Sequence, residues 1–184
     1  MKRLSLVRHA NSDRGDPALA DFRRPLNARG REEAALLGSF MLDSEIKPDC
    51  VLCSPSVRTR QTLELICERL PDSPCFIFFP ETLYNSSPEE VIRELKAESN
   101  SCSHVLLIGH NPAMHQAARD LADQARSDGG ALKRLNDGFP TAALAVFDFD
   151  VTAWSQAGRG KGALAMFKTP QELRGGDGEV RGTE

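Results

Sequence analysis

Short runs of apolar residues alternate along the chain with segments in which apolar residues recur every three or four positions. The runs predict buried strands, and the spaced segments predict helices that bury one stripe against a sheet. Four such strands are predicted in the N-terminal part of the chain: residues 4–7, 50–53, 75–79 and 105–108. Alternation of this kind is typical of an α/β three-layer sandwich, in which helices cover both faces of a largely parallel central sheet.

Capping residues indicate where the predicted helices begin. Helical spacing predicts a first helix over residues 27–43. Ser54 is a favoured N-cap residue and Pro55 a favoured first helical residue, so a second helix is expected to start there. Residues 87–96 open with a capping box, in which a serine and a glutamate side chain each bind a backbone N–H group of the other.

The C-terminal part of the chain predicts one more helix and a hairpin. Asn111, followed by proline, is expected to cap a helix that extends to about Ala125. Residues 126–140 contain three glycines and are predicted to form a loop. Residues 142–149 and 163–167 are expected to pair as an edge hairpin around a glycine-rich turn.

Length and composition agree with an ordinary globular protein. The chain has 184 residues, of which 40% are hydrophobic and 27% are charged. We predict a single domain over residues 1–170 and a disordered tail over residues 171–184, because the tail is glycine-rich and charged. The net charge of −3 gives no indication of a nucleic-acid or membrane partner. The absence of a signal peptide or a membrane-spanning run predicts a cytoplasmic location.

Five cysteines are scattered through the sequence. Cys50 and Cys53 lie within an apolar run, and no second cysteine pair follows them, so the spacing argues against a zinc site. Reduced thiols buried in the core are the better interpretation of all five.

Charged or titratable residues follow four consecutive predicted strands. Arg8 and His9 follow the first strand, Arg58 follows the second, Glu81 the third and His110 the fourth. Because ligands of parallel α/β sheets bind beyond the carboxyl ends of the strands, these side chains are expected to converge at one edge. One guanidinium group can bind two phosphate oxygens at once, and a neutral imidazole is a nucleophile near neutral pH. These arginines and histidines therefore indicate phosphoryl transfer.

The same segments resemble the motifs of the histidine phosphatase superfamily. Residues 6–10 are similar to its Arg-His-Gly signature, although Ala10 replaces the glycine. Three further segments resemble the start of its first helix, its second arginine motif and its second histidine motif, in family order: residues 25–30, 54–62 and 109–112. The likeness is greatest to SixA-type phosphohistidine phosphatases, because the short spacings after Arg58 and Glu81 leave no room for a domain that caps the site.

The resemblance implies a metal-independent phosphatase without a cofactor. His9 would form a phosphohistidine intermediate, while Arg8, Arg58 and His110 hold the phosphoryl oxygens and Glu81 occupies the position of an acidic proton donor. The second ring nitrogen of His9 is expected to donate to a backbone carbonyl, which leaves the attacking nitrogen unprotonated. The implied substrate is phosphohistidine on another protein.

Two alternatives remain open from the sequence. A phosphatase of small phosphate esters would use the same site, but would need Glu81 as an acid because an alkoxide is a poor leaving group. A non-catalytic phosphate-binding protein is the other alternative.

Three further residues, Arg60, His115 and His104, are interpreted as outside the chemistry. Arg60 lies on a different helix face from Arg58, so only one of the two can enter the pocket, and the Ser-Pro-x-x-Arg spacing selects Arg58. His115 is expected to be structural, and His104 is expected to be exposed to solvent.

Overall fold

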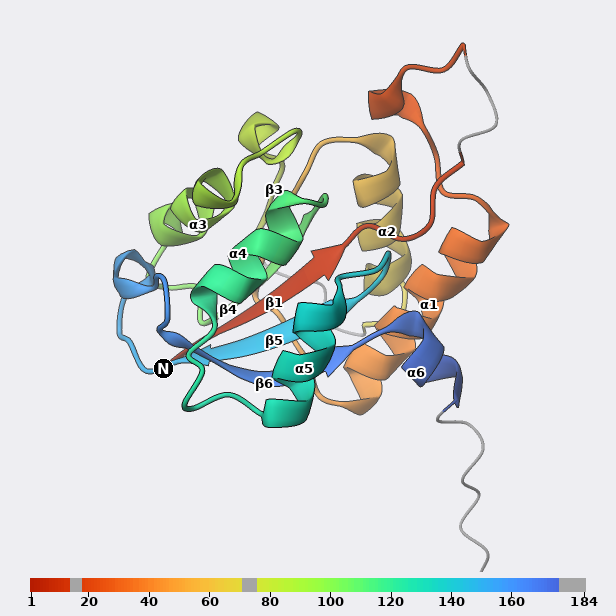
Figure 1. Ribbon diagram of the computed structural model, residues 1–184. Coiled ribbons are helices and arrows are strands. Elements are labelled where there is room, and N and C mark those ends of the chain that lie inside the picture. Colours follow the sequence, from red (N-terminus) through yellow and green to blue (C-terminus); the bar gives the residue numbers. More distant parts are fainter. Residues whose placement is uncertain (14–17, 71–75, 176–184) are drawn as a thin grey trace, which may run out of the picture.

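A six-stranded sheet forms the centre of the molecule (Figure 1). The computed structural model describes residues 1–13, 18–70 and 76–175. Its strands are β1 (Lys2–Arg8), β2 (Cys50–Cys53), β3 (Phe76–Phe78), β4 (His104–Gly109), β5 (Leu144–Phe149) and β6 (Gly162–Lys168), and they lie in the order β3-β2-β4-β1-β5-β6. β1 to β4 are parallel, whereas β5 and β6 form an antiparallel hairpin at one edge. The predicted parallel sheet with an edge hairpin is confirmed.

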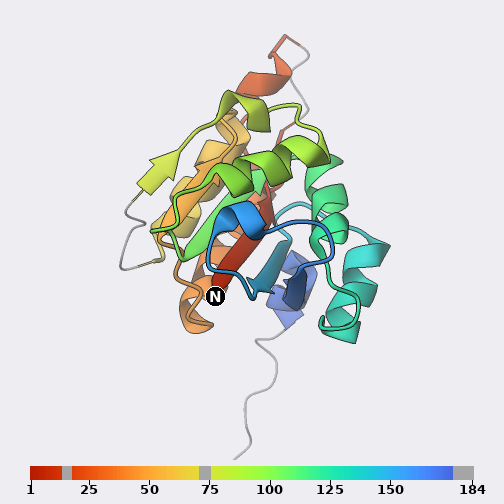
Figure 2. The same cartoon turned by 90° about the vertical axis from the view of Figure 1, so that its left-hand side faces the viewer.

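Helices cover both faces of this sheet (Figures 1 and 2). One face carries α1 (Ala28–Asp43), α2 (Val57–Cys67) and α6 (Pro170–Gly175), and the other carries α3 (Pro88–Ala97), α4 (Ala113–Leu121) and α5 (Gly129–Asp137). Short 3-10 helices lie in the connections that the structure describes: η1 (Asp21–Arg23), η2 (Glu81–Leu83) and η3 (Trp154–Gln156). The architecture is therefore the predicted three-layer α/β sandwich.

Successive residues of the central strands enter two separate apolar cores. In β4, Val105 and Leu107 pack beneath α3 and α4, whereas Leu106 and Ile108 pack beneath α1 and α2. All four side chains are fully buried. Because both faces of the strand are covered, its sequence is a continuous apolar run rather than an alternating one.

α2 begins later than its sequence predicted. Its first residue is Val57 and its N-cap is Ser56, so Ser54 and Pro55 precede the helix. The Ser54 hydroxyl instead forms a 2.8 Å hydrogen bond with Nε2 of His110. The predicted N-cap is wrong because a tertiary contact uses the side chain that could have capped the helix.

α4 also lacks its predicted N-cap, and it is shorter than predicted. It begins at Ala113 and ends at Leu121, short of the predicted end near Ala125. Asn111 does not cap it, and its side-chain amide donates to the carbonyl of Phe139 at 2.8 Å. The sequence places a good capping residue here, but the loop after α5 provides a competing acceptor.

Two segments predicted to be irregular contain helices. α5 lies within residues 126–140, and Asp128 caps it by accepting from the backbone N–H of Ala131 at 2.7 Å. The glycines at its first two positions hide the helical pattern in the sequence. α6 covers the first part of the tail predicted to be disordered, where Leu173 packs against the core beneath α1. The rest of that tail lies outside the described residues.

His104 is buried, in contrast to the prediction that it is exposed. Only 9% of the residue is accessible, and its Nε2 forms a 2.9 Å hydrogen bond with the Ser5 hydroxyl. Burial lowers the pKa of His104 to about 4, and the nearby charge of Arg3 acts in the same direction. His115 links two helices through a 2.7 Å hydrogen bond from Nε2 to the carbonyl of Leu135.

The cysteines of the described residues are free thiols. Cys50, Cys53 and Cys102 are buried, as predicted, but Cys67 is only half-buried, and Cys75 lies outside the described residues. Among the residues that the structure describes, no helix is both long enough and apolar enough to cross a bilayer.

Candidate active site

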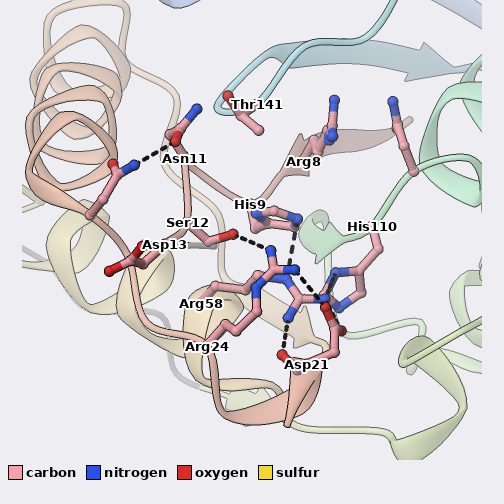
Figure 3. A pocket seen from close by; sticks show the side chains of 12 residues that line it. Arg8, His9, Asn11, Ser12, Asp13, Asp21, Arg24, Arg58, His110 and Thr141 are labelled. Carbon is pink, nitrogen blue, oxygen red and sulfur yellow. Dashed lines mark hydrogen bonds and ion pairs between the residues drawn. The ribbon is translucent and has the colours of Figure 1, made fainter. Parts of the chain in front are cut away.

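A polar cavity of about 760 Å³ opens at the carboxyl ends of the central strands (Figure 3). Four of the five predicted site residues line it: Arg8, His9, Arg58 and His110. Arg8 ends β1, the two histidines directly follow β1 and β4, and Arg58 lies in the first turn of α2. Since β1 and β4 are adjacent and parallel, their ends bring the two imidazole rings to a centroid separation of 5.1 Å.

The backbone fixes His9 at the floor of the cavity. Its N–H donates to the carbonyl of Gly109 at 3.1 Å, and the next N–H, of Ala10, donates to the Thr62 hydroxyl at 3.0 Å. Nδ1 of the ring lies 2.8 Å from the Ala10 carbonyl, which can only accept, so Nδ1 carries the hydrogen. Nε2 therefore presents a lone pair, as the sequence analysis expected.

Burial keeps this imidazole neutral. His9 is 7% exposed. Desolvation and, to a lesser extent, the charges of His110, Arg58 and Arg8 lower its pKa to about 3, against the opposing effect of the hydrogen bond to Ala10. At neutral pH the ring is thus a neutral imidazole, with the lone pair of Nε2 free of a proton, beside the guanidinium groups of Arg8 and Arg58.

Arg58 uses two different edges of its guanidinium group. On one edge, Nε lies 3.3 Å from Nε2 of His9, and Nη2 lies 3.3 Å from Nδ1 of His110. On the other edge, Nη1 donates to the backbone carbonyl of Asp21 at 2.6 Å, and Nη2 donates to Oδ2 of the same residue at 2.9 Å. The first edge faces the space between the two imidazoles, where a phosphoryl group would meet both the nucleophile and a paired donor.

Asp21 connects Arg58 to the rim of the cavity. Its Oδ2 also accepts from the Tyr84 hydroxyl at 3.0 Å, and its Oδ1 accepts from Arg24 at 2.8 Å. Arg24 in turn donates to the Ser12 hydroxyl at 2.7 Å. Although burial raises the pKa of Asp21, the hydrogen bonds from Tyr84 and Arg58 and the charges of both arginines lower it overall. Asp21 is therefore an ionised carboxylate that holds the far edge of Arg58.

His110 is oriented by Ser54. The hydroxyl lies 2.8 Å from Nε2 and can either donate or accept, while Nδ1 faces Arg58. Burial, with the charge of Arg58, lowers the pKa of His110 to about 4. Because Ser54 suits both tautomers, the neutral ring can present Nδ1 as an acceptor to Arg58 or as a donor to a phosphoryl oxygen.

Asn11, shortly after β1, is packed tightly against the start of α1. Asn27 caps α1 by accepting from the N–H of Gly30 at 2.9 Å, and its amide donates to Oδ1 of Asn11 at 2.7 Å. A Cβ atom at Gly30 would overlap the Asn11 carbonyl, so this approach requires glycine. Asn11 and Asn27 both line the cavity.

The fifth predicted site residue, Glu81, and the rejected alternative to Arg58, Arg60, both lie outside the cavity. Glu81 is exposed at the start of η2 and does not contribute to the cavity wall. Arg60 turns away from the cavity, where its guanidinium lies 4.2 Å from the ring centre of Phe79 and donates to the Pro55 carbonyl at 3.1 Å. The structure thus distinguishes Arg58 from Arg60, as the motif spacing predicted.

A second cavity of about 650 Å³ adjoins the first. Arg8 and Asn111 line both cavities, and both side chains donate to the Phe139 carbonyl, at 3.0 and 2.8 Å. The farther wall includes Arg134 and Glu172, which form an ion pair at 3.2 Å. The site therefore extends well beyond the volume that a phosphoryl group needs.

Sequence reasoning missed several residues that line or support the cavity: Ser12, Asp21, Arg24, Tyr84, Asn111 and Thr141. Most of them lie in connections, where no hydrophobic period points to a position in space. The available signal was the cluster of charged residues before residue 31, which the sequence alone could equally place on a solvated face.

Comparisons with known proteins agree with this geometry. Residues 4–76 match the family profile described as the histidine phosphatase superfamily (branch 1). The chain is 33% identical over 165 residues to the Mycobacterium tuberculosis protein Rv1276c, an alignment that covers 90% of this chain and 100% of the relative.

Two solved structures share the fold over nearly their whole length. A protein assigned as phosphohistidine phosphatase SixA from Agrobacterium tumefaciens is 29% identical with a TM-score of 0.74, covering 92% of this chain and 98% of that one. A protein given the same assignment from Nakamurella multipartitia is 28% identical with a TM-score of 0.77, covering 92% and 96%.

Proposed function

The chain belongs to the histidine phosphatase superfamily and is a SixA-like phosphatase, and we propose that it dephosphorylates phosphohistidine on another protein through a phosphorylated His9. The observation that carries this proposal is the environment of His9. Its Nδ1 hydrogen is held by the Ala10 carbonyl, and its Nε2 lone pair lies 3.3 Å from the Arg58 edge that would receive the phosphoryl oxygens.

The reaction proceeds in two displacements. Nε2 of His9 forms a bond to phosphorus while the bond from phosphorus to the substrate imidazole breaks, and the leaving imidazole keeps the proton on its distal nitrogen. Water then attacks the phosphorus, the Nε2–phosphorus bond breaks, and inorganic phosphate leaves with neutral His9 restored. Arg8, Arg58 and His110 stabilise the charge on the transferring oxygens in both steps.

The placement of acidic groups supports a nitrogen leaving group. Glu81 is exposed and outside the cavity wall, and Asp21 is ionised by its hydrogen bonds to Tyr84 and Arg58. An alkoxide would require a proton from an acid in this position, whereas an imidazole protonated on its distal nitrogen leaves without one. A phosphohistidine therefore fits the described side chains better than a small phosphate ester.

The adjoining cavity supports a macromolecular substrate. Together the two cavities provide about 760 and 650 Å³ along one surface, with Arg8 and Asn111 at their junction. A phosphorylated side chain would occupy the first cavity, and the residues that flank it in the substrate would lie over the second.

Hydrolysis of a phosphohistidine peptide and of p-nitrophenyl phosphate tests the proposal. Wild type should hydrolyse the peptide with the higher kcat/KM, His9→Gln should lose turnover of both substrates, and Glu81→Gln should retain turnover of the peptide. Arg134→Ala should weaken turnover of the peptide and leave that of p-nitrophenyl phosphate nearly unchanged. Retained activity of His9→Gln would refute the covalent mechanism, and a Glu81→Gln variant inactive on the peptide would refute the role assigned to the leaving group.

A further inference from the structure

Three metal-ligating side chains converge at the opposite end of β2 from the candidate active site. Cys50 opens β2, Glu98 directly follows α3, and Cys102 lies just before β4. Among the described residues, they form the one group of three or more His, Cys, Asp or Glu side chains whose ligand atoms all lie within 4.8 Å of one another. We propose that Cys50, Glu98 and Cys102 bind a divalent transition-metal ion, with Zn²⁺ as the preferred ion.

The ligand spacing fits a tetrahedral zinc site. With zinc bonded to sulfur at about 2.3 Å and to oxygen at about 2.0–2.2 Å, a tetrahedral angle separates a sulfur ligand from an oxygen ligand by about 3.5 Å. Oε2 of Glu98 lies 3.1 Å from Sγ of Cys50 and 3.8 Å from Sγ of Cys102. Shifts of a few tenths of an ångström would therefore bring the carboxylate oxygen to coordination distance from each sulfur, and all three ligand atoms already lie within 4.8 Å of one another.

The local charges permit the exchange of protons for a metal. Zinc binds cysteine as the thiolate, so Cys50 and Cys102 would each release a proton when the metal binds. Lys2 is 5% exposed and donates to the Cys102 carbonyl at 2.7 Å, which places a positive charge beside them. Binding of M²⁺ with release of two thiol protons leaves the net charge of this group unchanged.

A surface cavity gives access to the site. It encloses about 300 Å³, and Glu98 and Cys102 form part of its wall. Phe76 and Phe78 line its other side and are 52% and 48% exposed, so the cavity reaches solvent. Water entering by this route could occupy the fourth coordination position, which the protein leaves open.

The donor set determines which ions can bind. Two thiolates favour Zn²⁺ over the hard cations Mg²⁺ and Ca²⁺, which prefer oxygen ligands. The sequence pattern does not indicate this site, because Cys50 lies far along the chain from Cys102 and the pairing of β2 with β4 brings the two together. Its nearer neighbour in sequence, Cys53, faces the other core.

Titration of the reduced chain with Co²⁺, followed by Zn²⁺, tests the inference. Wild type should bind one Co²⁺ with an ultraviolet thiolate-to-cobalt charge-transfer band, and Zn²⁺ should displace it. Cys50→Ser and Cys102→Ser should each weaken binding by more than the roughly 10- to 100-fold typical of losing an outer-shell partner. Cys67→Ser removes a half-buried thiol outside the group and should bind like wild type.

A second readout protects the test against misfolded variants. Zn²⁺ should raise the Tm of wild type and Cys67→Ser, but not that of Glu98→Gln, which preserves the shape of the side chain. Phosphatase activity of every variant reports whether the distant His9 site is folded. No charge-transfer band in wild type, or a band that survives both Cys50→Ser and Cys102→Ser, would overturn the proposal without affecting the proposed phosphatase mechanism.

Discussion

Replacement of Asp21 by asparagine isolates the contact that holds the far edge of Arg58. The variant keeps the backbone carbonyl that accepts from Nη1 at 2.6 Å, and it keeps a side chain of the same size. It loses the negative charge that accepts from Nη2 at 2.9 Å. We expect the edge of Arg58 that faces His9 and His110 to become less well defined, and the transition state to lose stabilisation.

The structure sets the size of this effect. Hydrogen bonds to charged groups contribute about 1.5–3 kcal/mol. The Asp21 side chain is 50% exposed while that of Arg58 is 7% exposed, so solvent screening reduces the contribution to the low end of this range. A loss of about 1.4 kcal/mol corresponds to a decrease of about tenfold in kcat/KM. Removal of a negative charge near a phosphate dianion should also favour substrate binding and so lower KM. The decrease in kcat/KM should therefore appear as a decrease in kcat.

Steady-state hydrolysis of a phosphohistidine peptide measures both constants. Asp13→Asn removes the same charge from the wall of the same cavity and serves as the matched control. In an Arg58→Lys background, Asp21→Asn should have little further effect, because the two residues act through one contact. Full additivity in this double-mutant cycle, or an equal response of Asp13→Asn, would refute the positioning role of Asp21.

Contacts elsewhere in the chain carry three further expectations. Arg58→Lys should lower kcat/KM by about 10²- to 10³-fold, because lysine lacks the paired donors of a guanidinium group. Arg60→Lys should leave kcat/KM nearly unchanged, and equal losses in the two variants would contradict this expectation. Gly30→Ala should lower stability by about 1–3 kcal/mol in denaturant unfolding, while Gly129→Ala, which meets open space, should not. Three buried histidines have native pKa values of about 3, 4 and 4 against about 6.5 unfolded, so the unfolded state binds more protons below pH ~6.5. As the pH is lowered from ~6.5 to ~4, the free energy of unfolding should therefore fall by about 1.4 kcal/mol per pH unit for each of these histidines. Denaturant unfolding at a series of pH values should show this slope, and His104→Gln should reduce it.

The convergence of Arg8, His9 and His110 could be predicted because it depends on few long-range details. Each residue directly follows a strand whose apolar run is unmistakable, and parallel strands end at the same side of a sheet. Adjacent strands then bring the residues within contact. Arg58 required one more inference, since its helix starts two residues later than Pro55 suggested, yet the side chain still faces the strand ends.

Glu81 shows what strand ends alone cannot predict. It follows β3, but β3 lies at the outer edge of the sheet, and both β2 and β4 separate it from β1. Strand order is set by which strands pair, and short apolar runs carry little information about their partners. The sequence therefore places Glu81 at the correct side of the sheet but cannot give its distance from His9.

The predicted N-caps of α2 and α4 are wrong for a related reason. Ser54 and Asn111 are both good N-caps by type, and both instead make tertiary hydrogen bonds, to His110 and to the Phe139 carbonyl. Local preferences of about 1 kcal/mol decide a helix end only when no equally good partner lies nearby. At the edge of this sheet, partners from other strands and loops do lie nearby, and the polar side chains serve the site.

The environment of His9 has a direct consequence for the proposed phosphoryl transfer. Burial and the charges of His110, Arg58 and Arg8 disfavour the protonated ring, which keeps its pKa low and its Nε2 lone pair available. Attack on phosphorus makes the same ring cationic, but it then bears a phosphoryl group whose negative oxygens face the two arginines. The hydrogen bond from Nδ1 to Ala10 strengthens as the ring becomes charged. In the proposed mechanism, the groups that repel a proton from His9 would thus stabilise its phosphorylated form, because the charge of the phosphoryl group outweighs that of the ring.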